Sequence, residues 1–223
     1  MEPTNIKILS IENVTHDVRR IRTVKPPDLN FTPGQAADVS INKEGWKEEV
    51  RPFTFTSVPE DDFLEFTIKT YPSHNGVTNE LLSLKAGDEL IISGVFGAIQ
   101  YKGEGVFIAG GAGVTPFISI LRELKRKNNT GNNMLIFANK TSGDIINKDE
   151  FNEMLRKNFI NILSQEKTDE YYNGHIDEEF LKKNVPDLNR YFYVCGPPPM
   201  MDAVEKQLAD LDVKNDRIVK EEF

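Results

Sequence analysis

Cysteine is almost absent from this chain of 223 residues, which contains a single one, Cys195. One cysteine excludes an internal disulfide, and it also excludes an iron–sulfur cluster ligated by cysteines of this chain alone. Low cysteine content is typical of proteins in a reducing compartment, so we expect a cytoplasmic location.

Long apolar runs and an excess of basic residues are missing as well. No stretch approaches the roughly 20 apolar residues that a membrane-spanning helix requires. The N-terminal sequence MEPTNIKILS lacks the charged and apolar regions of a signal peptide. We therefore expect no membrane span. The 27 Lys and Arg residues against 35 Asp and Glu give a net charge of −8, which disfavours nucleic acid as a partner.

Histidine is scarce too, and its positions do not indicate a metal centre. His16, His74 and His175 are far apart in the sequence and have no ligand spacing. We expect structural or surface roles for them. The apolar content is nevertheless ample, because 39% of the residues are hydrophobic and 28% are charged, which indicates a folded core.

The first part of the chain, residues 1–103, has the pattern of an all-β domain. Short apolar or alternating runs are separated by turn signals such as Pro33-Gly34. Many short antiparallel strands favour a barrel or a sandwich. One helix is expected over residues 78–83, and the predicted strands include 6–11, 18–23, 37–41, 63–70 and 89–93.

The second part, residues 104–223, alternates strands with helices. Apolar residues at helical spacing follow position 116, and Asn128–Gly131 ends that helix. Strand–helix alternation predicts a parallel sheet that is covered on both faces. The five predicted strands are 106–109, 133–139, 159–164, 191–195 and 217–221, and the further predicted helices are 149–157 and 200–211.

A glycine-rich turn, GGAGVTP at residues 110–116, follows the first strand of this second part. Glycines allow the backbone to approach phosphate, and the free N–H groups at a helix start favour an anion. The turn therefore indicates a nucleotide-phosphate site. The alternative is a tight strand–helix turn without a ligand. Thr115 adds a hydroxyl that suits either reading, because it can cap the helix that Pro116 opens.

A second candidate segment, Cys195-Gly196-Pro197, ends a later strand of the same sheet. Ligands of open α/β sheets bind at the carboxyl ends of the strands, so this segment is a candidate for the same site. Three consecutive prolines predict an extended exit before the helix at Met200. The alternative for Cys195 is a buried structural thiol.

Two further candidate segments lie in the all-β part. In RPFTFTS, residues 51–57, strand alternation directs every second side chain from Arg51 to one face and Thr54 to the other. Arginine suits bidentate binding of phosphate. In HNGVTNEL, residues 74–81, a loop enters a helix that Thr78 is expected to cap, and the amides there suit a phosphate. The alternatives are an ordinary aromatic strand and an ordinary helix start.

Together, these segments resemble the motifs of the ferredoxin–NADP reductase superfamily. The resemblance covers essentially the whole chain, with the motifs in the right order. RPFT at 51–54 is similar to the R-x-Y-[ST] flavin motif, GVTN at 76–79 to the flavin pyrophosphate motif, GGAGVTP and Cys195-Gly196-Pro197 to the pyridine-nucleotide motifs, and FTPGQ at 31–35 is typical of the first domain.

The resemblance implies a six-stranded antiparallel FAD-binding barrel over residues 1–103, and an NAD(P)-binding α/β domain with a parallel sheet over residues 104–223, with no iron–sulfur domain. Thr54 would face flavin N5. Phe53 stands where the family usually has tyrosine, so stacking on the flavin stays possible while a hydroxyl hydrogen bond is lost. The implied FAD-binding residues are Arg51, Pro52, Phe53, Thr54, Gly76, Val77 and Thr78.

For the pyridine nucleotide, the resemblance implies that Cys195 lies near the nicotinamide. Glu221 and Phe223 resemble the acidic and aromatic residues close to the flavin in several members, and the alternative for them is an ordinary chain end. Thr54, Cys195 and Glu221 form the implied catalytic set. The implied nucleotide-binding residues are Gly111, Gly113, Thr115, Pro116, Cys195 and Gly196, with Phe223 over the isoalloxazine.

Nucleotide preference depends on ANKTSGDI, residues 138–145, which resembles the segment of NADH-dependent cytochrome reductases. Asp144 there would accept hydrogen bonds from ribose hydroxyls and repel a 2′-phosphate, which favours NADH over NADPH. Lys140 and Ser142 suit a 2′-phosphate, which would favour NADPH. The alternative for Asp144 is a helix cap.

The function that follows is an FAD-dependent NAD(P)H oxidoreductase. Flavin takes a hydride and releases electrons singly, here to a separate redox protein such as a ferredoxin, a flavodoxin or an oxygenase component. Two alternatives stay open: a flavin reductase that releases reduced flavin, and a nucleotide-binding electron-transfer subunit without turnover.

Overall fold

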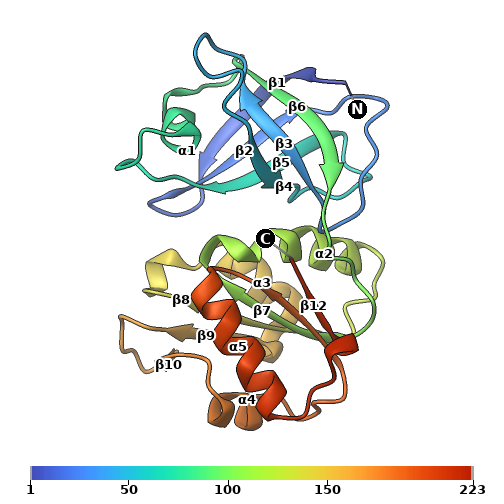
Figure 1. The fold of residues 1–223 in the computed structure, drawn as a ribbon, viewed down its shortest axis with the longest axis vertical. Helices are drawn as coiled ribbons and strands as arrows, with labels where there is room; N and C mark the ends of the chain where they lie inside the picture. The colour runs from blue at the N-terminus through green and yellow to red at the C-terminus, as the bar shows by residue number, and fades with distance from the viewer. Residues whose placement is uncertain (1, 222–223) are drawn as a thin grey trace. The chain divides into compact units, whose positions relative to one another are not determined.

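The fold is known from a computed structural model, which describes residues 2–221 (Figure 1). Contacts divide the chain into two compact units. Unit 1 holds the residues through Gln100 together with Thr115–Glu123, and unit 2 holds Tyr101–Val114 and the residues from Leu124 onwards. The helix α2, Thr115–Arg126, is therefore shared between the units. The boundary at residues 103 and 104 stays a prediction.

Unit 1 contains a six-stranded antiparallel sheet with strand order β4-β3-β6-β1-β2-β5. An isolated antiparallel bridge joins Phe55, just after β4, to Phe66 in β5, so the sheet curls toward closure as a barrel. This confirms the predicted six-stranded antiparallel fold. The strands are β1 Thr4–Asn13, β2 Val18–Val24, β3 Ala36–Ile41, β4 Arg51–Thr54, β5 Phe63–Lys69 and β6 Glu89–Phe96.

The core of unit 1 forms because alternate residues of these strands point inward. Ile6 and Ile8 of β1 are buried, as are Leu64 and Phe66 of β5. Phe55 is buried among them and stacks on Phe31, with ring centroids 4.3 Å apart. Burial of these aromatic side chains fixes the chain directly after β4.

One short helical segment covers this core, as predicted. It comprises α1, Val77–Glu80, and the 3₁₀ turn η1, Leu81–Ser83. Thr78 does not cap it: the cap position is Gly76, whose backbone is extended, and no side chain bonds there. The helix starts one residue earlier than expected because Val77 is buried in the core and anchors the first turn.

Unit 2 contains a parallel sheet of six strands in the order β10-β9-β8-β7-β11-β12. All five predicted strands are present. The sixth, β10, spans only Tyr172–Asn173, and two residues give no periodicity for a pattern to detect. The strands are β7 Gly105–Gly110, β8 Met134–Asn139, β9 Phe159–Leu163, β10, β11 Tyr191–Cys195 and β12 Ile218–Lys220.

Both faces of this parallel sheet are covered. Val106, Ile108 and Val194 share one buried cluster with residues of α4, Glu178–Asn184, and α5, Pro198–Asp210. On the opposite face Phe137 of β8 contacts Phe151 of α3, Lys148–Leu155, edge to face. The remaining 3₁₀ turns are η2 Gly111–Val114, η3 Ser142–Asp144, η4 Arg156–Asn158 and η5 Asn215–Arg217.

Two further features of unit 2 differ from the prediction. Helix α4 was not predicted, although its signal is present: the Asp177 carboxylate accepts a hydrogen bond from the Phe180 amide at 2.7 Å, as an N-cap does. The prolines after Pro197 do not form an extended exit. Pro198 and Pro199 make the first turn of α5, where the fixed φ of proline fits and its missing N–H is not needed.

Within residues 2–221, no helix has both the length and the apolar character that crossing a membrane requires.

Candidate active site

The edge strand β4 carries the first candidate motif. It pairs with β3, with Thr54 opposite Ala36 and Phe53 opposite Ala37. Pro52 is tolerated because an edge strand does not need every N–H. Arg51 is exposed: its guanidinium donates to the Val50 carbonyl at 2.7 Å and lies 3.3 Å from a Glu49 carboxylate oxygen. Phe53 is partly buried against the core of unit 1, and Thr54 is partly buried.

The residues directly after β4 are fixed by buried hydrogen bonds. Thr56 and Ser57 are fully buried. The Thr56 hydroxyl donates to the Glu65 carboxylate at 2.9 Å, and the Glu65 amide donates to the Ser57 hydroxyl at 3.0 Å. The Ser119 hydroxyl of α2 donates to the Ser57 carbonyl at 2.6 Å. The strand that presents Thr54 is therefore firmly held at its carboxyl end.

Glu65 is the unexpected centre of this network, with no exposed side-chain surface. Its carboxylate oxygens lie 2.6 Å from the Arg122 guanidinium and 2.9 Å from that of Arg22, with Arg20 at 3.7 Å. Burial acts to raise the pKa of Glu65, but the three guanidinium groups outweigh it and hold that pKa below its ordinary value. The only sequence signal for this role of Glu65 is that it is a charged residue within the largely apolar run FLEFTIK.

The glycine turn after β7 is shaped by close packing on the next motif. Gly111 has a φ of +52°, which favours glycine. At Gly113 a Cβ atom would lie 2.4 Å from the Cys195 carbonyl oxygen and 2.6 Å from the Gly196 Cα. Only glycine permits this approach. Because β7 and β11 are parallel neighbours, the turn and the Cys195-Gly196 segment meet at the carboxyl edge of the sheet. Thr115 and Pro116 continue from the turn as the first residues of α2.

Cys195 is 5% exposed, and its thiol donates to a Glu221 carboxylate oxygen at 3.9 Å. Burial, and then the charge of Glu221, raise the pKa of this thiol far above its ordinary value, so it stays protonated at neutral pH. Burial also raises the pKa of Glu221. Glu221 directly follows β12, whose pairing with β11 brings it beside Cys195. Phe223 lies outside the described residues.

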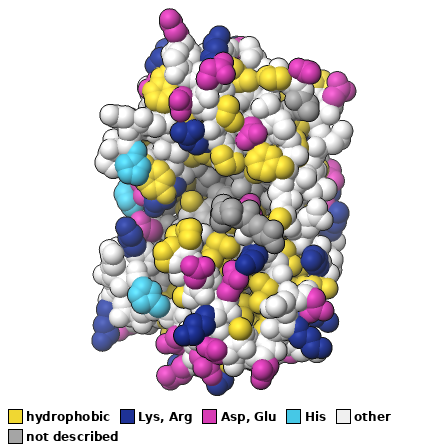
Figure 2. All heavy atoms as spheres, viewed as in Figure 1, with side chains coloured by type: hydrophobic (Ala, Val, Ile, Leu, Met, Phe, Trp, Pro, Cys, Tyr) yellow, Lys and Arg dark blue, Asp and Glu magenta, His cyan; other side chains and the backbone are white. Residues whose placement is uncertain are grey.

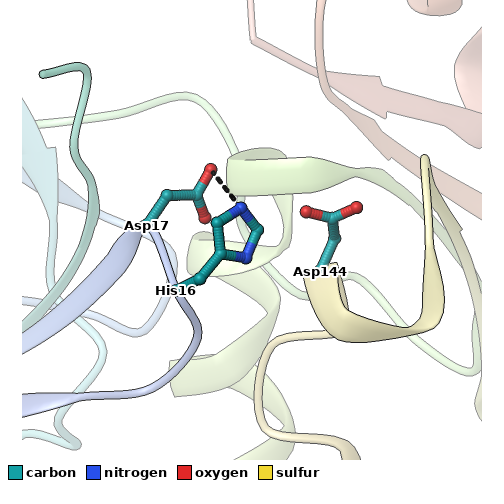
Figure 3. Close-up of side chains that lie close together, drawn as sticks. All are labelled: His16, Asp17 and Asp144. Atoms are coloured by element: carbon teal, nitrogen blue, oxygen red, sulfur yellow. Dashed lines mark ion pairs between the residues drawn. The ribbon is translucent and has the colours of Figure 1, made fainter.

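Asp144 ends η3, in the segment that follows β8, and its carboxylate bonds Thr141. Its carboxylate accepts hydrogen bonds from the Thr141 amide at 2.8 Å and from the Thr141 hydroxyl at 2.7 Å, which forms a capping box. Asp144 thus helps to cap its own turn, η3, whereas the N-cap of the next helix, α3, is Asn147. A contact of Asp144 with a nucleotide stays a prediction. Figure 3 draws this carboxylate on its turn of η3.

Two of the three histidines make contacts at the surface of unit 1. His16 is an exposed residue between β1 and β2 and forms an ion pair with Asp17, with the two charged groups 3.7 Å apart (Figure 3). His74 stacks on Tyr71, with ring centroids 5.5 Å apart. These are the surface contacts that the sequence favoured.

Comparison with known proteins assigns a family to both halves of the chain. Residues 3–100 match the model of an FAD-binding domain, and residues 107–206 match the model of an oxidoreductase NAD-binding domain. The chain belongs to the ferredoxin–NADP reductase superfamily and is an oxidoreductase with an FAD-binding domain and an NAD-binding domain.

Individual relatives support this assignment. The chain is 30% identical to NADH-cytochrome b5 reductase 2-A of Vanderwaltozyma polyspora, covering 89% of this chain and 73% of that protein. It is 29% identical to the reductase component of propane 2-monooxygenase from Mycolicibacterium goodii, covering 100% and 68%. The CS-b5R domains of human Ncb5or in the NAD+ form align with a TM-score of 0.84 at 26% identity, covering 98% and 69%. The chain spans 64% to 68% of the length of the propane monooxygenase reductase components that it matches.

Proposed function

We propose that this chain uses FAD to oxidise NADH and passes the electrons singly to a separate redox protein. The observation that carries the proposal is the packing of Gly113 on Cys195 and Gly196, because it joins the two pyridine-nucleotide motifs at the sheet edge where dinucleotides bind. When bound, FAD supplies hydride acceptance and one-electron release.

The residues of unit 1 fit a flavin. Arg51 is exposed and its guanidinium can exchange Glu49 for a pyrophosphate. A Cβ at Gly76 would meet nothing within 4 Å, which leaves room for a ligand at the start of α1, where Val77 and Thr78 follow. Phe53 offers a ring for stacking, and Thr54 offers its hydroxyl at flavin N5. Pro52, which lies between Arg51 and Phe53, restricts the backbone of β4.

The residues of the two pyridine-nucleotide motifs position a nicotinamide nucleotide. Gly111, whose open side has nothing within 4 Å of an added Cβ, gives the backbone access to the phosphates, and Thr115 and Pro116 follow at the start of α2. The protonated Cys195 thiol does not act as a nucleophile. It shapes the nicotinamide position and keeps water out, while Glu221 accepts its hydrogen bond. The role of Phe223 stays a prediction.

The acceptor is proposed from the relatives. One is a reductase component of a monooxygenase and another is named for cytochrome b5. A small redox protein or an oxygenase component is therefore the expected partner, in the cytoplasm. NADH is favoured over NADPH because Asp144 brings a carboxylate to the end of β8, the ribose end of a dinucleotide domain.

Reconstitution tests the proposal. The protein is loaded with FAD, reduced anaerobically with NADH while the flavin absorbance is followed, and then assayed with ferricyanide. We expect flavin retention, bleaching by NADH and turnover. Arg51→Ala removes a charge-assisted phosphate contact of about 1.5–3 kcal/mol, so its FAD dissociation constant is expected to rise roughly 10- to 150-fold. The surface variant Arg190→Ala is the control. Failure to take up FAD contradicts the proposal.

A flavin reductase, which releases its flavin, is the second candidate. Arg51 forms an ion pair with Glu49 and Phe53 lacks a hydroxyl, so both residues offer the flavin fewer contacts. Flavin lost on gel filtration, together with turnover of added free flavin, would favour it. A non-catalytic subunit would bind both cofactors without bleaching.

A further inference from the structure

We propose that Asn75 is a site of spontaneous deamidation, which converts it to an aspartate or an isoaspartate and thereby weakens the binding of FAD. The modification itself is argued from the loop that contains Asn75 and from a second copy of the same dipeptide elsewhere in the chain. Its effect on the flavin rests on the proposed function, because it concerns the segment 76–79 that is proposed to bind the FAD pyrophosphate.

The dipeptide Asn-Gly occurs twice in the sequence, as Asn75-Gly76 and as Asn173-Gly174. In this dipeptide the backbone nitrogen of the glycine reaches the asparagine side chain easily, because glycine has no Cβ to hinder the approach and its backbone is permissive. Both asparagines are exposed, and both glycines are half-buried. The two copies therefore match in sequence and in exposure, and their hydrogen bonds distinguish them.

The first copy is unrestrained. Asn75 lies in the loop between β5 and α1 (Figure 1), and all residues from 71 to 75 are exposed. Neither the Asn75 side chain nor the Gly76 amide makes a hydrogen bond with any residue in the described part of the chain. A Cβ at Gly76 would meet nothing within 4 Å. The nitrogen of Gly76 and the side chain of Asn75 are therefore free to approach each other, with open space for water.

The second copy is held by hydrogen bonds on both reacting groups. The Gly174 amide donates to the Leu163 carbonyl at 2.9 Å. The side-chain nitrogen of Asn173 donates to the carbonyls of Leu163 and Glu166, each at 3.0 Å. Asn173 also belongs to β10, where it pairs with Leu163 of β9. These bonds must open before the glycine nitrogen can attack, so the fold protects this copy.

The reaction needs water and no other reactant. The Gly76 nitrogen loses its proton and attacks the side-chain carbonyl carbon of Asn75. A carbon–nitrogen bond forms, the bond to the side-chain nitrogen breaks, and that nitrogen leaves as ammonia with the proton from Gly76. Water then opens the resulting cyclic imide at either of its two carbonyl groups, which gives an aspartate or an isoaspartate at position 75. Nothing is oxidised or reduced, and a neutral amide becomes a carboxylate.

The new charge affects the segment that is proposed to bind the FAD pyrophosphate. The carboxylate arises at the residue directly before Gly76, and it repels the negative charges of a pyrophosphate. The isoaspartate form also lengthens the backbone by one methylene group immediately before Gly76, which displaces the start of that segment. Both products therefore lower the affinity for FAD, and the protein loses flavin as it ages.

Peptide mapping by mass spectrometry tests the modification, with the second copy as an internal control. The full chain without FAD is incubated at neutral pH, and the conversion of Asn75 and of Asn173 is followed with time. We expect Asn75 to react at least about tenfold faster than Asn173 in the native protein. In guanidinium chloride the two rates should become similar, because the bonds that protect Asn173 are then lost. Equal native rates, or a faster reaction at Asn173, overturn the assignment.

Two variants test the effect on the flavin. Asn75→Asp carries the charge of the product, and Asn75→Gln is the neutral control. Fluorescence titration with FAD is expected to show a dissociation constant about tenfold higher for Asn75→Asp than for the wild type, and no change for Asn75→Gln. No rise in Asn75→Asp, or an equal rise in Asn75→Gln, overturns the link to the flavin. If the wild type takes up no FAD, the proposed function fails, and the peptide mapping still decides whether Asn75 is the modified site.

Discussion

Cys195 illustrates, at the scale of the residue, how environment determines chemistry. The same side chain beside a cation would be a reactive thiolate, but here it is buried and faces a carboxylate. Its neighbour Glu221 also has a raised pKa because of burial. Burial is thus the first cause of the raised pKa in both members of the pair.

We predict that Cys195 is nearly inert to alkylation in the native protein. The thiolate is the reacting species, and burial together with Glu221 suppresses it, so iodoacetamide at pH 8 should modify native protein at least about 100-fold more slowly than urea-unfolded protein. Mass spectrometry of the intact chain gives both rates. Similar rates in the two states would contradict a protonated, buried thiol.

Gly113 allows a second prediction at this scale. An added Cβ would collide with the Cys195 carbonyl oxygen at 2.4 Å, and backbone atoms have no room to yield. Gly113→Ala is therefore expected to displace the nucleotide turn and raise KM for NADH about tenfold or more, while the FAD spectrum stays normal. An unchanged KM in Gly113→Ala would show that the turn does not bind the nucleotide.

At the scale of elements, helix α2 is fastened to β5 and to the strand after β4. Arg122 donates both to the Glu65 carboxylate at 2.6 Å and to the Thr56 carbonyl at 2.7 Å. Ser119, one turn earlier, bonds the Ser57 carbonyl. The helix that begins at Thr115 and the strand that ends at Thr54 are thus held by one buried network within unit 1.

This network predicts a pH-dependent stability. The pKa of Glu65 is lower in the folded protein than its ordinary value of 4.5. Its contribution to stability is therefore complete above that value and is lost as the pH falls through the folded pKa. Urea unfolding gives the free energy of unfolding at pH 7 and at pH 4. Between these two pH values, that free energy should fall less in Glu65→Gln than in the wild type.

Arg122→Leu provides the companion measurement. It leaves Glu65 buried with fewer partners, and breaking a buried pair costs about 3–5 kcal/mol. Lys125→Ala, which removes an exposed ion pair from the same helix, should cost less than about 1 kcal/mol. A wild-type protein that is equally stable at both pH values would argue against an ionised Glu65.

Much of the architecture could be predicted at this scale, because it depends on periodicity. The strands of unit 1 alternate, and β7 is a continuous buried run, so both sheets follow from local pattern. Short elements such as β10 carry no such pattern. Pro198 and Pro199 were misread because proline disfavours a helix interior but fits its first turn.

The sites were predictable only in part. The motifs containing Gly113 and Cys195 are local in sequence, and the parallel pairing of β7 with β11 brings them together. Glu65 and Arg122 belong to no motif. Their roles arise from a contact between segments 57 residues apart in the sequence, which no spacing rule could indicate.

At the scale of the whole molecule, charge is the property that partners meet first. Acidic residues exceed basic ones by eight, and both kinds are interspersed on the face that Figure 2 shows. A net negative charge attracts cations and repels anions over roughly 30 Å at an ionic strength of 0.01 M, but over only about 3 Å at 1 M. Electron acceptors of opposite charge should therefore respond to salt in opposite directions.

We predict that kcat/KM for ferricyanide, an anion, rises about three- to tenfold between low and high salt, while that for cationic cytochrome c falls by a similar factor. NADH is kept saturating so that reduction of the flavin does not limit the rate. Menadione, a neutral acceptor, is the control and should change little. If the ferricyanide rate instead falls with rising salt and the cytochrome c rate rises, a local basic patch, and not the net charge of −8, governs the encounter with acceptors. That result would direct the search for the acceptor surface to one basic region of the chain.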